Sequence, residues 1–84
     1  MAAYKVELRN DEGVWKTLER EVDDVRILEF DATRLIGDLI AQPENAQRIV
    51  DDQACRFDVS DSSGLLLFVM HLQLTESPAI GRRR

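Results

Sequence analysis

The segment from Asp24 to Ala41 most constrains the fold, because its apolar residues follow the period of an α-helix over its whole length. They recur at steps of three and four residues, which places them on one helical face. That face consists of Val25, Leu28, Ala32, Leu35, Ile36 and Leu39. Asp23 or Asp24 can cap the first amides, and Pro43 ends the helix because the residue before a proline avoids helical backbone angles. The sequence therefore predicts an amphipathic helix over residues 24–41.

Four segments around this helix show the two-residue alternation of β-strands. They cover residues 3–9, 14–21, 54–60 and 65–74. Glycine-containing turns at residues 10–13 and 61–64 join them into two hairpins. We therefore predict an α+β fold of the order ββαββ, in which one long helix packs on one face of a four-stranded, mainly antiparallel sheet. Residues 42–53 fit either a short helix that begins at Pro43 or a loop.

The second strand, residues 14–21, is strongly polar and carries charges of both signs. Charged side chains are typical of the strand at the edge of a sheet, where they discourage pairing with other chains. Regular alternation places Trp15 on the face opposite Lys16. We therefore expect this strand at an edge of the sheet.

The last strand differs from the other three because both of its faces are apolar. Leu65, Leu67 and Val69 occupy one face, and the other is formed by Leu66, Phe68, Met70 and Leu72. A strand that is apolar on both faces is normally buried on both. One helix covers only one face of the sheet, so the second face requires another cover.

Ile27 and Phe30 lie outside the apolar stripe of the predicted helix. Large apolar groups on the outer side of a helix indicate contact with another chain, or coverage by residues 42–53 or by the C-terminal tail. Twofold pairing is the commonest form of assembly, so we predict a homodimer. The predicted interface residues are Ile27, Phe30, Leu66, Phe68, Met70 and Leu72.

The length and the net charge of the chain limit the number of domains and the kinds of partner that it can bind. The chain of 84 residues suits one domain, which we place at residues 1–76, followed by a disordered basic tail at residues 77–84. The net charge of −5 disfavours binding to nucleic acid or to anionic membranes. No apolar run approaches the ~20 residues of a membrane-spanning helix, and no signal peptide is expected. A single cysteine fits a reducing compartment, so we expect a cytoplasmic protein.

Three motifs resemble those of a family of short, uncharacterised proteins from rhizobia and other alphaproteobacteria. They are the turn Asp11-Glu12-Gly13, the helix that begins at Asp24, and the segment Phe57-Asp58-Val59-Ser60-Asp61-Ser62-Ser63-Gly64. The resemblance extends roughly over residues 4–72. It implies the same order of strand, strand, helix, strand and strand, and it implies no activity, because that family has none established.

The sequence offers one candidate pair for catalysis, Cys55 and His71, on neighbouring strands of the second hairpin. No group that would form an oxyanion hole or orient the histidine is recognisable. We therefore expect Cys55 to be a buried structural thiol and His71 to be a partly buried histidine. The paired carboxylates lack the spacing of a calcium loop, and the glycines form no phosphate-binding loop.

These observations favour a binding or regulatory role without catalysis, and we predict no catalytic residues, no cofactor and no metal. The predicted function is a homodimeric protein-interaction module, with an unidentified protein partner as a further expectation. The alternative is a small-molecule-binding protein with a pocket between helix and sheet. An enzyme that uses Cys55 and His71 ranks last.

Overall fold

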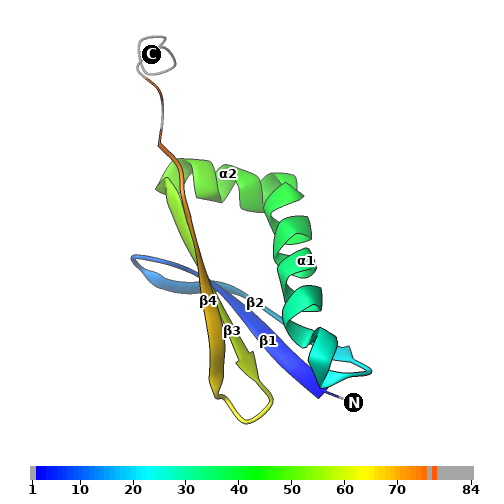
Figure 1. Ribbon diagram of the computed structural model, residues 1–84. Coiled ribbons are helices and arrows are strands. Elements are labelled where there is room, and N and C mark those ends of the chain that lie inside the picture. Colours follow the sequence, from blue (N-terminus) through cyan, green and yellow to red (C-terminus); the bar gives the residue numbers. More distant parts are fainter. Residues whose placement is uncertain (1, 76, 78–84) are drawn as a thin grey trace.

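The computed structural model describes residues 2–75 and 77, which form a four-stranded sheet and two helices (Figure 1). The strands are β1 (Ala2–Asn10), β2 (Gly13–Val22), β3 (Ala54–Asp61) and β4 (Leu66–Gln73). A 3-10 turn, η1 (Val25–Ile27), leads into α1 (Leu28–Ala41), and α2 (Pro43–Asp52) follows. The predicted tail over residues 77–84 lies outside the described part of the chain, apart from Ser77.

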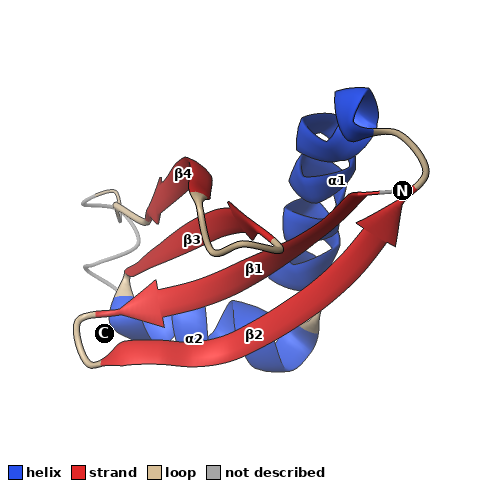
Figure 2. Cartoon of the chain, turned by 90° about the horizontal axis from the view of Figure 1, so that it is seen from below, coloured by secondary structure: helices blue, strands red, loops and turns tan. Residues whose placement is uncertain are grey.

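The sheet has the strand order β2-β1-β3-β4, and every neighbouring pair is antiparallel. Figure 2 shows both helices on one face of this sheet, while no described element covers the opposite face. The predicted α+β fold with a helical layer on one face is therefore confirmed. That layer contains two helices, because residues 42–53 are helical over most of their length.

The start of the first helix differs from the prediction. Asp24 accepts a hydrogen bond from the backbone N–H of Arg26 at 2.9 Å, so it caps a 3-10 turn rather than the α-helix itself. A 3-10 turn has three residues per turn, so the spacing of the apolar face does not continue backwards from Leu28. Val25 is consequently 68% exposed, and its assignment to the buried face was wrong.

The junction between α1 and α2 follows from Pro43. Gln42 is extended, with φ −70° and ψ 129°, as expected for a residue before proline, and Pro43 occupies the start of α2. Asn45 is buried and donates to the backbone oxygen of Leu39 and to the side-chain oxygen of Gln42, both at 3.0 Å. The Leu39 carbonyl also accepts the backbone N–H of Gln42 at 3.3 Å, so Asn45 adds a second hydrogen bond at the C-terminal end of α1.

The hydrophobic core lies between the helices and the two central strands, β1 and β3. Its buried apolar side chains are Tyr4, Val6, Leu8, Val22, Leu28, Ala32, Leu35, Ile36, Leu39, Ile49, Cys55, Phe57 and Val59. At its edge the Tyr4 hydroxyl donates to Asp31 at 2.6 Å, and Asp31 lies 3.2 Å from Arg20 Nε. Burial and the hydrogen bond to Asp31 raise the pKa of Tyr4. This contact joins α1 to β1 and β2.

A β-bulge in β2 changes the direction of Trp15. Leu8 pairs with Lys16 and Arg9 pairs with Val14, so Trp15 has no partner on β1. The Arg48 side chain of α2 lies over the Trp15 ring, 4.8 Å from its centre, and Lys16 approaches Glu44 of α2 at 3.6 Å. The expected separation of Trp15 and Lys16 onto opposite faces was therefore wrong, because both side chains contact α2.

The face of the sheet without helices is polar but not fully solvated. Asp58 and Ser60 point to this face, yet both are buried, with Asp58 only 6% exposed. Asp58 accepts a hydrogen bond from Arg56 Nε at 2.6 Å and lies 3.6 Å from Arg9 Nε. Two arginine side chains thus cover the carboxylate where no helix does.

Candidate interaction surface

The two edges of the sheet differ in charge. β2 forms one edge, as predicted, and its Lys16, Glu19, Arg20 and Glu21 are charged. β4 forms the other edge, and residues 65–74 contain no aspartate, glutamate, lysine or arginine. Among residues 2–75 and 77, no strand pairs with the outer side of β4. Long apolar edge strands without protecting charges readily pair with further strands, so β4 is the candidate interaction surface.

The β4 register places three of the predicted interface residues on the helix side of the sheet. Phe68 pairs with Val59, Met70 with Phe57 and Leu72 with Cys55, and facing residues in an antiparallel pair share a face. Phe68, Met70 and Leu72 therefore pack against the core while remaining partly exposed. The helices do not cover β4 as fully as they cover the central strands.

A second bulge marks the N-terminal end of the regular part of β4. Val59 pairs with Phe68, but Ser60 pairs with Leu66, so Leu67 is the additional residue. Leu66 is therefore removed from the row formed by Phe68, Met70 and Leu72, and it lies 49% exposed. Leu65, Leu67 and Leu74 are also exposed, which the predicted interface did not include. The sequence feature that could have identified these exposed residues is the absence of charged side chains throughout residues 65–74.

The backbone of β4 presents free hydrogen-bonding groups at the sheet edge. Leu74 donates its N–H to the carbonyl oxygen of Gln53 at 2.9 Å, which identifies a hydrogen-bonded pair. Such pairs recur at every second residue of an antiparallel ladder, so Phe68, Met70 and Leu72 also turn their backbone groups toward β3. The backbone groups of Val69, His71 and Gln73 consequently point away from the sheet.

The other predicted interface residues form a separate exposed patch at the start of α1. Ile27 is 48% exposed and Phe30 is 69% exposed, with Val25 beside them in the chain. Neither residue belongs to the core or packs against it. The structure therefore divides the predicted interface into an α1 patch (Val25, Ile27 and Phe30) and the β4 edge.

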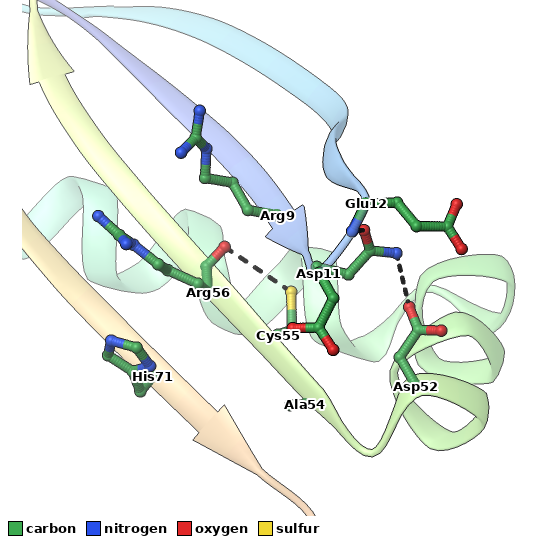
Figure 3. A pocket seen from close by; sticks show the side chains of 9 residues that line it. Arg9, Asp11, Glu12, Asp52, Ala54, Cys55, Arg56 and His71 are labelled. Carbon is green, nitrogen blue, oxygen red and sulfur yellow. Dashed lines mark hydrogen bonds between the residues drawn. The ribbon is translucent and has the colours of Figure 1, made fainter.

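Cys55 and His71 point to opposite faces of the sheet. Cys55 lies opposite Leu72 and points into the core, whereas His71 lies opposite Arg56, one residue along each strand. Because successive side chains of a strand point to opposite faces, the thiol and the imidazole leave their strands on opposite faces, although both residues line one hollow at the start of β3. His71 is exposed rather than partly buried, and Cys55 is buried as predicted. The thiol lies 3.9 Å from the backbone oxygen of Arg56, with that bond drawn in Figure 3.

Cys55 is expected to resist alkylation in the folded protein. Burial raises the pKa of the Cys55 thiol from 9.0 to about 11, so little of the reactive thiolate is present near neutral pH. Treatment with iodoacetamide at pH 8 should leave the native thiol unmodified for hours and modify it within minutes in denaturant, as followed by mass spectrometry. Fast modification of the native protein would contradict this.

The same shift predicts a loss of stability at alkaline pH. The unfolded thiol ionises near 9.0, while the folded thiol stays protonated until about 11, so the unfolded state binds fewer protons between these values. The contribution of the protonated Cys55 thiol to the free energy of unfolding is therefore fully present below pH 9 and is lost as the pH rises to about 11. Cys55→Ala should reduce this part of the decline in the free energy of unfolding.

Two hollows lie at opposite ends of the sheet. One of about 420 Å³ lies where the β1–β2 turn meets the start of β3 (Figure 3). Its wall combines Arg9 and Arg56 with the carboxylates of Asp11, Glu12 and Asp52, so it presents no field of one sign to a charged ligand.

The other hollow, of about 550 Å³, lies beside the β3–β4 turn. Its Asp61 is engaged within the turn, since the Ser63 hydroxyl donates to it at 2.6 Å and lowers its pKa. Neither hollow is lined by a residue of α1, so neither corresponds to the predicted pocket between helix and sheet.

Within residues 2–75 and 77, no three histidine, cysteine, aspartate or glutamate side chains gather as a metal-binding group. The described helices are also too short and too polar to cross a membrane.

Comparison with models of protein families, with curated proteins and with solved structures finds no match to this chain.

Proposed function

We propose that this protein is a homodimeric protein-interaction module without catalysis, and that its contacts are made along the edge of β4. The observation that supports this proposal is the contrast between the two sheet edges. β2 carries the charges that prevent strand addition, whereas the eight residues of β4 carry none. Addition of a strand to an exposed edge is a common mode of protein recognition, in which backbone hydrogen bonds supply affinity and side chains supply specificity.

The geometry of the polar residues favours a role without catalysis. Cys55 and His71 lie on opposite faces, and burial raises the pKa of Cys55 to about 11, so the thiol is a poor nucleophile. A lone thiol buried in the core also suits a reducing compartment such as the cytoplasm.

Light scattering coupled to size-exclusion chromatography tests the assembly. At micromolar concentration we expect one species with twice the monomer mass of 9.6 kDa. A species that remains at 9.6 kDa across this range would contradict a homodimer.

A charge in the α1 patch provides the control. Phe30→Glu adds a charge to an exposed side chain outside the core, so it should leave both folding and dimer mass unchanged. Monomers formed by Phe30→Glu would show that the α1 patch, and not β4, carries the contact.

A further inference from the structure

The outward backbone groups of β4 define where an added strand would bind. Val69, His71 and Gln73 each present an N–H and a C=O away from β3, and hydrogen bonds to these groups continue the ladder. The side chains of Val69 and His71 lie on the face without helices, because they pair with Asp58 and Arg56. We call this line of outward backbone groups at Val69, His71 and Gln73 the seam. The apolar side chains of Phe68, Met70 and Leu72 lie on its helix side, and the apolar and polar side chains of Val69, His71 and Gln73 lie on its other side.

The lack of charge on β4 identifies the kind of strand that fits it. A charged strand would lose solvation against Leu66, Phe68 and Leu72 without gaining an opposite charge. The matching strand is therefore apolar, uncharged and free along one edge, and β4 itself has these properties. A chain with net charge −5 also needs an uncharged seam if two copies are to approach without repulsion.

We propose that a second copy of the chain pairs antiparallel with β4, with the twofold axis at Met70, so that two four-stranded sheets become one continuous sheet. This rests on the proposed function and specifies the partner and the register of the same surface. Met70 then faces Met70 of the second copy, Phe68 faces Leu72, and Val69 faces His71. The outward groups of Val69 and His71 meet each other and form the hydrogen-bonded pairs.

Neighbouring registers fit less well. An axis at His71 places two imidazoles opposite each other and pairs Phe68 with Leu74, beyond the end of the strand. An axis at Val69 places His71 opposite Leu67, the additional residue of the bulge, where the ladder is irregular. The Met70 axis keeps the facing pairs from Phe68 to Leu72 within the regular part of β4, and the additional residue Leu67 faces only Gln73 near the end of the strand. An axis at Val69 keeps only the pairs from Phe68 to Met70 in the regular part.

The paired sheet has a direct consequence for the apolar row. A twofold axis perpendicular to the sheet leaves the helices of both copies on the same face. Phe68, Met70 and Leu72 of the two copies then form one continuous apolar strip between the two helical layers. The partly exposed side chains of this row are thereby covered by the same row of the second copy.

Disulfide cross-linking tests the register in full-length protein that carries Cys55→Ala to remove the native thiol. Directly facing residues of an antiparallel pair have Cβ atoms about 4.5–5.5 Å apart, and closest at non-hydrogen-bonded positions such as Met70 with Met70, so a disulfide can form after a small adjustment. Met70→Cys should therefore cross-link to itself under mild oxidation. An equal mixture of Val69→Cys and His71→Cys, which alter side chains outside the core, should cross-link between the two variants. The Met70 register would be overturned if His71→Cys alone gave a higher yield of disulfide-linked dimer than the mixture of Val69→Cys and His71→Cys. It would also be overturned if no sample formed a disulfide-linked dimer.

A charge at the seam gives an independent measurement. His71→Lys changes an exposed side chain beside the proposed axis and should raise the dimer dissociation constant roughly tenfold or more. Thr17→Lys, the same charge on the exposed edge strand β2, should leave it unchanged. A dimer that persists in His71→Lys without cross-links would refute the β4 pairing while leaving the homodimer itself intact.

Discussion

Phe57→Ala is expected to reduce the free energy of unfolding by about 3–5 kcal/mol, because it leaves a cavity at the centre of the core. Phe57 is 1% exposed and lies on β3 between Leu8 on β1 and Met70 on β4. Small domains are stable by only about 5–15 kcal/mol, so this loss consumes much of the total. Thermal unfolding should show a decrease in Tm of more than about 12 °C, given about 4–8 °C per kcal/mol at this size.

Phe30→Ala is the matched control for this cavity. The side chain is the same, but Phe30 is 69% exposed, so its removal should change the free energy of unfolding by no more than about 0.5 kcal/mol. Both variants must be compared with the parent at one protein concentration, because a dimer is stabilised by mass action. Equal effects at the two positions would mean that the core is not centred on Phe57.

Asp58→Ala is expected to cost about 1.5–3 kcal/mol, the range for a hydrogen bond to a charged group. Arg9 and Arg56 face each other across β1 and β3, and like charges in this position destabilise a sheet. The Asp58 carboxylate lies between them, at 2.6 Å from Arg56 Nε and 3.6 Å from Arg9 Nε. Its removal leaves the two guanidinium groups without an intervening negative charge.

Chemical denaturation measures the free energy of unfolding that Asp58→Ala loses, and a double-mutant cycle shows how much of this loss comes from the contact between Asp58 and Arg56. Arg56→Ala combined with Asp58→Ala should cost less than the sum of the single changes, because each variant removes the same contact. Asp38→Ala removes an exposed carboxylate from α1 and should change stability by about 0.5 kcal/mol or less. If Asp58→Ala is as mild as Asp38→Ala, the carboxylate does not hold the two arginines.

Local structure was largely predictable from the sequence, because periodicity and turn residues act over short distances. Gly13 and Gly64 adopt positive φ at the predicted turns, and Pro43 separates the two helices where expected. The buried face of α1 was correct from Leu28 onward. The two bulges were not predictable, since an additional residue in one strand depends on which residues of the neighbouring strand it faces.

The candidate surface was only partly predictable. The apolar character of residues 65–74 is visible in the sequence, but the position of β4 at the sheet edge is set by pairing between β1 and β3, which are far apart in the chain. The burial of Asp58 likewise depends on arginines from two strands. The expectation for His71 failed because alternation does not reveal which face of a strand lacks a cover.

The order of the four strands and the long helix, their approximate limits and the apolar stripe of that helix from Leu28 onward were determined by the amino-acid sequence alone, since backbone preferences and side-chain periodicity are local properties. The tertiary structure decided which strands became edges, which apolar groups remained exposed, and that Cys55 and His71 were separated. These features depend on long-range pairing, where one residue of register or one bulge moves a side chain to the other face of the sheet.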